Sequence, residues 1–445
     1  MLNWIEAALL AALAPLFLFP AVDREWPFLV FPLLWVARWW VEERRKQGGE
    51  AGLRDGEMGV RGWAGTPLDA AIMVLALQLF VSSVAAGDWE AMLPKIAGIL
   101  YGILVYFALV RLVTTDRLAG AGLGVFVAGG TALAALGLTG MFVSKEPNFR
   151  EIVAFLFKRV PQRNWAFEGA EEGLNPNAVA GVMLLFVPLC LALAFAWTKR
   201  RRPGRESAGE VTARGKAFAA PAGTSAAVLC GLLSVFFLIV LFLTQAIAAW
   251  VALVAGLWLV LPTIRSRVIG AVPAALFVAA VLVFLPMTDK EATARKGQPF
   301  WKYKIELRYK RWDVGIDAVR ERPLTGVGVN LLRQRPELGY EHAHAHNHML
   351  HTAAEMGIPG LIAYLAILGG AAFMCRETWR RASAGWMRAA ARGLGAGQAA
   401  HFIFGWGDAI PLGAKPGIFF WVSLALIAAL YGRTRGNCGH SRSAE

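Results

Sequence analysis

The sequence contains few cysteines, and none lies where a disulfide would be expected. Cys190 and Cys230 fall inside strongly apolar segments, and Cys375 and Cys438 fall beside basic loops. Structural disulfides form in segments that face an oxidising compartment. Because no cysteine occurs in the segments that we assign below to the outer side, the sequence predicts no disulfide framework.

The centres of the long apolar segments contain almost no Asp, Glu, Lys or Arg. These residue types occur near the segment ends instead, as at Glu6, Arg38, Asp69, Lys95 and Arg111. An ion-coupled transporter binds its coupling ion through ionisable side chains near the middle of the bilayer. Their scarcity argues against coupled transport and directs attention to the outer edge of the membrane.

Apolar residues dominate the chain and predict a membrane protein. They make up 57% of the 445 residues, whereas soluble domains are usually about 45–50% apolar. About twelve segments are long enough to cross a bilayer as helices. They centre on 3–20, 26–41, 67–86, 94–112, 118–142, 177–197, 223–243, 245–262, 268–286, 354–374, 386–405 and 416–432. The expected fold class is an all-α polytopic membrane protein.

Short basic loops predict the orientation of these segments. The loops near 41–47, 198–205, 374–388 and 432–442 fall on one side, which the positive-inside rule assigns to the cytoplasm together with both termini. Residues 1–286 then hold spans one to nine, including a basic cytoplasmic loop at 198–222 and an outward amphipathic segment at 144–176. Residues 287–346 form one large outward loop, and residues 347–445 hold the last three spans and a cytoplasmic tail.

Five of the seven histidines lie between His342 and His351, at the outer end of an apolar segment. In an extended strand His342, His344 and His346 would share one face, which would suit a metal ion if a further ligand closed the site. We expect no metal there. For His342, His348 and His351 we expect positions at the polar interface of the membrane.

His346 opens a longer pattern: His346-Asn347, nine residues, then Gly357-Ile358-Pro359-Gly360. This pattern resembles the motif of the O-antigen ligase and polymerase superfamily, in which Leu350 and Glu355 also occupy favoured positions. The stretches at 308–332 (RYKRWDVGIDAVRERPLTGVGVNLL) and 174–193 (LNPNAVAGVMLLFVPLCLAL) are similar to two further stretches of that superfamily, in the same order.

The resemblance implies a GT-C-like fold and metal-independent, inverting glycosyl transfer without a cofactor. The donor would be O-antigen polysaccharide on undecaprenyl diphosphate and the acceptor the lipid A-core oligosaccharide, at the periplasmic face of a bacterial inner membrane. The expected partners are these two substrates and membrane lipids, with no nucleic acid. His346 would be the catalytic base, because a neutral imidazole can take a hydroxyl proton near neutral pH. Asn347, His344 and Asp408 would support it. Asp408, an outward acid before the last span, could orient a histidine or an arginine, or it could cap a loop.

The donor's diphosphate leaves as an anion, so arginines are expected beside it. The candidates are Arg308 and Arg311, one helical turn apart, and Arg150, Arg159 and Arg163 in the amphipathic segment. Snorkelling or surface ion pairs are the alternative explanation for each. One departure from the superfamily concerns the Ser-Arg pair at the start of its eighth helix, where this chain has Ala246 and Ile247.

Other activities remain open from the sequence. A polysaccharide polymerase or a protein O-oligosaccharyltransferase would share the same motifs. The single dominant outward loop favours a ligase over a polymerase, since polymerases often carry two large outward loops. A lipid or polysaccharide transporter is the alternative from another class, and it would need a path that the apolar segments do not supply.

Overall fold

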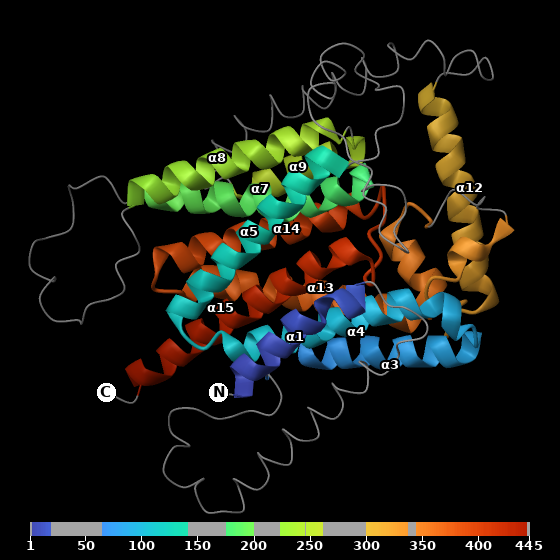
Figure 1. The fold of residues 1–445 in the computed structure, drawn as a ribbon, viewed down its shortest axis with the longest axis horizontal. Coiled ribbons are helices and arrows are strands. Elements are labelled where there is room, and N and C mark those ends of the chain that lie inside the picture. The colour runs from blue at the N-terminus through green and yellow to red at the C-terminus, as the bar shows by residue number, and fades with distance from the viewer. Residues whose placement is uncertain are drawn as a thin grey trace, which may run out of the picture.

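The computed structural model describes residues 2–18, 65–140, 175–199, 223–244, 246–260, 300–336 and 344–442. Within these ranges the regular structure is helical and no strand occurs (Figure 1). The helices are α1 (Leu2–Leu18), α3 (Asp69–Ala86), α4 (Trp89–Leu112), α5 (Asp116–Gly140), α7 (Pro176–Lys199), α8 (Gly223–Leu243), α9 (Ile247–Val260), α12 (Phe300–Glu321), α13 (His348–Arg381), α14 (Gly385–Phe404) and α15 (Ile418–Arg442), with short 3-10 turns η2 (Leu332–Gln334) and η4 (Lys415–Gly417).

Seven helices in the described ranges are long and apolar enough to cross a membrane, judged by length and composition. They are α3, α4, α5, α7, α8, α13 and α15. Helix α1 has 17 residues and α9 has 14, so both are shorter. The chain is therefore a multi-pass helical membrane protein. The predicted spans at 26–41 and 268–286 lie outside the described residues, and both the total of about twelve and the GT-C-like arrangement stay predictions.

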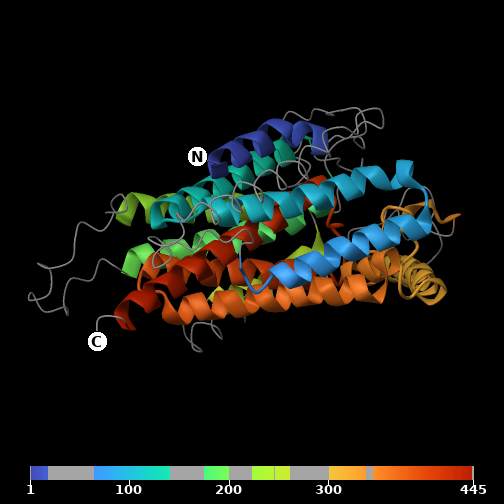
Figure 2. The same ribbon diagram turned by 90° about the horizontal axis from the view of Figure 1, so that it is seen from below.

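The long helices run side by side along the long axis of the molecule, and α12 crosses them at one end (Figure 1). Figure 2 shows α12 at the same end of the bundle when the molecule is turned by 90°. The N and C labels both lie away from α12 in the two views. Which side of a membrane each end of the bundle faces stays a prediction.

Helix α7 lies at the centre of the bundle, where glycines on α14 allow a close approach. A Cβ atom added at Gly393 would come within 2.6 Å of Leu189 Cα, and one at Gly397 within 3.0 Å of Leu185 Cα. Membrane helices gain packing contacts where small residues let their backbones meet. A larger residue at either glycine would push α14 away from α7.

Helix α13 contains a break at Gly357 that the loop after α12 fills. Gly357 has φ 71° and ψ 175°, and Pro359 has no N–H to donate to the carbonyl four residues earlier. The loop after α12 supplies two replacement donors: Val327 N donates to Ala354 O at 2.9 Å, and Gly328 N donates to Glu355 O at 3.2 Å. Helix α3 supplies two more: Ser82 Oγ donates to Glu355 O, and Gln78 Nε2 donates to Met356 O, both at 2.7 Å. The Gly-Ile-Pro-Gly stretch is thus the place where the α12 loop and α3 join α13.

One face of α12 packs on the start of α13. Ala318 is fully buried in a small apolar cluster with Ala345 and Ala354, and Leu350 packs against this cluster. A Cβ atom at Gly315 would lie 2.9 Å from the Leu350 side chain, so the two helices approach closely there. Ala345 stands between His344 and His346, and its burial under α12 fixes the histidine segment against the bundle.

Candidate functional site

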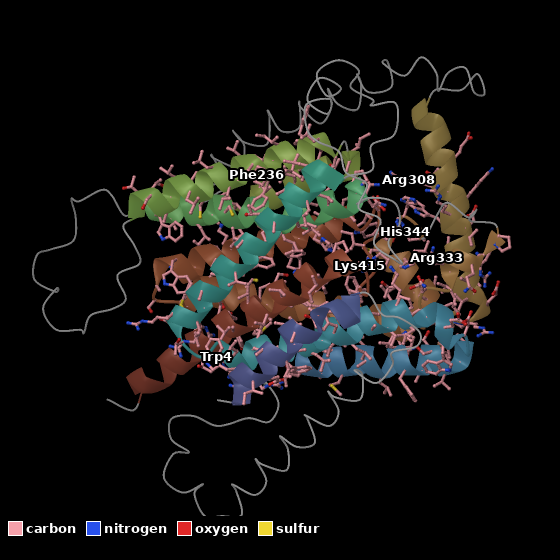
Figure 3. All side chains as sticks on the ribbon, viewed as in Figure 1. Trp4, Phe236, Arg308, Arg333, His344 and Lys415 are labelled. Atoms are coloured by element: carbon pink, nitrogen blue, oxygen red, sulfur yellow. The ribbon has the colours of Figure 1, made fainter. Side chains whose placement is uncertain are left out.

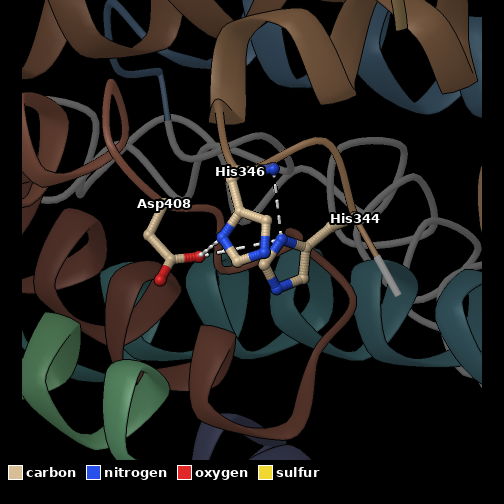
Figure 4. Close-up of side chains that lie close together, drawn as sticks. All are labelled: His344, His346 and Asp408. Atoms are coloured by element: carbon tan, nitrogen blue, oxygen red, sulfur yellow. Dashed lines mark hydrogen bonds and ion pairs between the residues drawn. The ribbon is translucent and has the colours of Figure 1, made fainter. Parts of the chain in front are cut away.

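His344, His346 and Asp408 come together at the end of the bundle that α12 covers (Figure 4). The Asp408 Oδ1 atom lies 3.1 Å from His346 Nδ1 and 3.7 Å from His344 Nδ1. His344 and His346 precede α13, whereas Asp408 follows α14. A backbone hydrogen bond of 2.6 Å from His348 N to Gly405 O joins the start of α13 to the end of α14. This contact holds the two histidines close to Asp408.

The backbone around His346 is held in an uncommon conformation. His346 has φ 50°, in the left-handed region that non-glycine residues adopt at a cost of about 1–3 kcal/mol. Its N–H donates to His344 Nδ1 at 3.3 Å, and the two rings meet edge to face with centroids 4.4 Å apart. The surrounding contacts therefore determine where the His346 ring points.

Asn347 has a local structural role at this site. It is the N-cap of α13, and its Oδ1 atom accepts from Leu350 N at 3.0 Å. Asn is among the preferred N-cap residues because its side chain satisfies an N–H that the helix leaves without a partner. Asn347 therefore starts α13 directly after His346, which is how it would support that histidine.

The electrostatics favour a neutral His344 beside an ionised Asp408. Burial lowers the pKa of His344 to about 3, and the charge of Asp408 offsets only part of that effect. Burial raises the pKa of Asp408, but the interaction with His346, and to a smaller extent the electrostatic interaction with His344, outweigh it, so that the pKa lies below its usual value. At neutral pH the site therefore contains a carboxylate facing two histidine rings.

The carboxylate orients the His346 ring in a way that suits proton transfer. A carboxylate only accepts hydrogen bonds, so it favours the ring tautomer with the proton on Nδ1, 3.1 Å from Asp408 Oδ1, and the lone pair on Nε2. A histidine beside a carboxylate in this way can act as a general base, because the carboxylate stabilises its conjugate acid. The geometry suits removal of a proton from a hydroxyl group.

The same three residues also form a possible metal site. One ligand atom from each of His344, His346 and Asp408 lies within 4.8 Å of the others. Two imidazoles and a carboxylate resemble the protein ligands of catalytic zinc sites. The metal alternative from the sequence used His342 as the third histidine; His342 lies outside the described residues, and Asp408 stands in that place here.

His348 and His351 differ from their expected positions at the polar interface. Both are buried, at 4% and 3% exposure. His348 lies against Tyr364, with ring centroids 4.8 Å apart, and His351 Nε2 lies 3.3 Å from Glu355 Oε2. They face inward because the first turns of α13 lie between α12 and the bundle. The sequence signal for this second histidine–carboxylate pair is its i, i+4 spacing.

The two α12 arginines lie on the helix face that packs toward the site. Arg308 and Arg311 continue the stripe formed by Gly315 and Ala318, because residues three and four apart share a helix face. Arg311 is buried at 6% exposure and Arg308 is half-buried. Figure 3 shows Arg308, Arg333, Lys415 and His344 at one end of the bundle. Arg150, Arg159 and Arg163 lie outside the described residues.

One lysine, Lys95, adds positive charge that sequence reasoning did not assign to the site. Lys95, on α4, is close enough for its charge to contribute to the lowered pKa of His344. Lys415 lies in η4, a few residues after Asp408. Only the packing of the loop after Asp408 on α4, where a Cβ atom at Gly413 would meet Lys95 O at 2.1 Å, brings these two segments together.

Ile247, which replaces the superfamily arginine, begins the helix next to Asp408. Ala248 follows it, and a Cβ atom added at Gly407 would lie 2.9 Å from Ala248 Cβ. The start of α9 therefore adjoins the turn that carries Asp408. The chain has an apolar side chain at this position, so positive charge at the site has to come from other elements.

Comparison with known proteins supports the sequence motifs. Residues 232–365 match the model of a family described as O-antigen ligase. No curated protein matches the chain. The matched range includes α12, the His346–Asn347 motif and the Gly357–Gly360 break, but it ends before Asp408. The match at residues 232–365 thus supports the resemblance to the O-antigen ligase superfamily that the sequence motifs carry.

Proposed function

We propose that this protein is an O-antigen ligase that transfers polysaccharide from undecaprenyl diphosphate to the lipid A-core oligosaccharide, at the periplasmic face of the inner membrane. The family match indicates glycosyl transfer with polysaccharide and lipid substrates in general. The observation that carries the specific chemistry is the His346–Asp408 pair, in which a half-buried His346 lies beside a buried Asp408 at the end of a bundle of membrane helices.

The proposed reaction is a single displacement. The acceptor hydroxyl transfers its proton to His346 Nε2 as its oxygen forms a bond to C1 of the donor sugar. The bond from C1 to the phosphate oxygen breaks, and both electrons leave with the diphosphate. One displacement inverts the configuration at C1. Asp408 stabilises the imidazolium that forms, without taking its proton.

Arg308 and Arg311 would bind the departing diphosphate. Arginine pairs with two phosphate oxygens through its planar fork, and it neutralises leaving-group charge without proton transfer. Both side chains lie on the α12 face that packs over the histidine segment. With Ile247 at the superfamily's arginine position, we assign more of this charge to Arg308, supported by Arg311 or by the arginines of the 144–176 segment.

A lipopolysaccharide gel from a strain lacking the gene tests the proposed activity. Loss of a ligase leaves bare core oligosaccharide and polymer that accumulates on its carrier lipid. Loss of a polymerase leaves core bearing one repeat unit, which would replace our proposal with the polymerase. A protein O-oligosaccharyltransferase would leave the lipopolysaccharide ladder intact and remove glycan from a protein.

Purified protein gives the second test, because it separates transfer from transport. In detergent there is no compartment to cross, so a ligase still joins the lipid-linked donor to an added acceptor. A protein that only moves lipid-linked glycan across the membrane would form no product. Product formation that depends on both substrates therefore supports the enzyme over the transporter.

A further inference from the structure

Glu355 bridges two parts of the site that the proposed reaction does not yet use. Its Oε1 atom accepts from Asn330 N at 2.9 Å, and its Oε2 atom lies 3.3 Å from His351 Nε2. Glu355 is buried at 5% exposure, within one of the first turns of α13. Burying a carboxyl group is costly unless it is paired, so its two contacts define its orientation.

The His351 end of this bridge leads to the proposed base. The His351 ring stands edge to face to the His344 ring, with centroids 6.3 Å apart. His344 in turn accepts from the His346 backbone N–H and faces Asp408. Contacts therefore run from Glu355 to His351, from His351 to His344, and from His344 to His346. If the His351 ring moved, the His344 ring would lose the contact that holds one of its sides.

The Asn330 end of the bridge leads to α12. Asn330 has φ 69°, a conformation that Asn tolerates better than most residues, and its Nδ2 atom donates to Ala91 O at 2.6 Å. It belongs to the loop 322–331, which leaves the end of α12. The same loop covers the break at Gly357. Glu355 therefore connects the helix that carries Arg308 and Arg311 to the histidine segment.

We propose that Glu355 and His351 form a positioning pair, which holds the His344 and His346 rings in their working arrangement and ties it to the loop that leaves α12. The proposal rests on the proposed role of His346 as the base. Neither residue of the pair touches substrate in this reading. The pair acts by restricting the His346 ring, and it links ring position to the placement of α12 on α13.

Two conservative variants test the positioning pair. Glu355→Gln keeps an oxygen that can accept from Asn330 N, but it loses the carboxylate that faces His351. His351→Gln removes the ring that adjoins His344. We expect either change to lower kcat about ten- to a hundredfold, because small displacements of a catalytic group cost that much. The KM values for donor and acceptor should stay within about twofold.

A matched control lies on the same helix. Glu377 is also buried, and its Oε2 atom pairs with Arg381 Nε at 2.8 Å, at the other end of α13. Glu377→Gln removes a comparable charge and a comparable pair at a distance from the site. We expect wild-type kcat and KM for this variant, with equal protein in the membrane.

Combined variants distinguish this proposal from the proposed role of His346. If the pair acts through His346, Glu355→Gln causes no further loss in a His346→Ala background, and Glu355→Gln with His351→Gln is no worse than either alone. Wild-type kcat for both single variants, a raised KM at unchanged kcat, or a full additional loss in the His346→Ala background would each overturn the positioning pair. Full transfer by His346→Ala alone would instead overturn the role of His346.

Discussion

Two of the histidine–carboxylate pairs at this site form in different ways. His351 and Glu355 are four residues apart on α13, so any helix at this position brings them together. His346 and Asp408 lie on separate segments, and they meet only because the start of α13 docks on the end of α14. The local pair, His351–Glu355, needs only one helix to form. The distant pair, His346–Asp408, forms only when α13 and α14 have packed together.

This difference also separates the proposed roles. The distant pair includes a half-buried histidine with an unusual backbone conformation. The local pair is enclosed by α12, the 322–331 loop and α3. Reactivity is therefore assigned to the pair made by tertiary contact, and positioning to the pair made by the helix.

The largest effect is expected from removing the base itself. His346→Ala should lower transfer by about a hundred- to ten-thousandfold, which is the usual contribution of general base catalysis. The variant should still insert and bind the lipid-linked donor, because the arginines and helices are unchanged. Single-turnover transfer and donor binding by purified protein are the measurements. Near-normal transfer would remove His346 from the catalytic role.

Replacing Asp408, the carboxylate of the distant pair, should have the next largest effect. The Asp408→Asn amide can donate to His346 Nδ1 and so move the ring proton to Nε2, the wrong atom for a base. We expect a loss of kcat of about a hundredfold, the lower end of what general base catalysis contributes, and more than for Glu355→Gln. Asp116→Asn is the matched control, since Asp116 pairs with Arg433 at 2.9 Å elsewhere in the bundle. An equal loss in both variants would indicate a purely structural effect.

Arg308→Ala should weaken transfer without disturbing either pair. One charge-assisted phosphate contact contributes roughly 1.5–3 kcal/mol, so the expected loss is about ten- to a hundredfold. Arg308→Lys keeps the charge without the fork and should retain partial activity. Arg320→Ala is the control on the same helix, because the Arg320 side chain is 76% exposed. Wild-type transfer by Arg308→Ala, with loss at Arg150, Arg159 or Arg163, would move the diphosphate site to the 144–176 segment.

The lowered pKa of His344 predicts a pH dependence of stability. The unfolded chain takes up a proton on this histidine below about pH 6.5, whereas the folded protein does so only near pH 3. Folding is therefore less stable as pH falls between these values, by at most about 1.4 kcal/mol per pH unit from this group. Thermal unfolding of His344→Gln from pH 7 to pH 4 should show a smaller slope than wild type. Equal slopes would contradict the lowered pKa of His344.

The smallest effect is expected from chelation. If His344, His346 and Asp408 act as a base and its supports, EDTA leaves transfer unchanged and added divalent ions do not increase it. Loss of transfer in EDTA, followed by recovery with zinc, would make these three residues ligands. It would also convert the distant pair from a catalytic unit into a metal site.

Sequence reasoning located much of the site because its signals are local. The His346-Asn347 motif marks the start of α13, where Asn347 caps the helix. The Gly357–Gly360 stretch marks the break that a positive φ and a proline require. The spacing of Arg308 and Arg311 places them on one face of α12. Each inference uses the period of a helix or the conformation of a single residue.

Only the tertiary structure decided which of these local features meet. Sequence named Asp408 as a candidate partner for a histidine or an arginine, and the docking of α13 on α14 selected His346 and His344. The burial of His351 depends on α12 and its loop covering the first turns of α13. Helical periodicity fixes which face a side chain occupies, but which faces come together depends on packing between segments far apart in the chain.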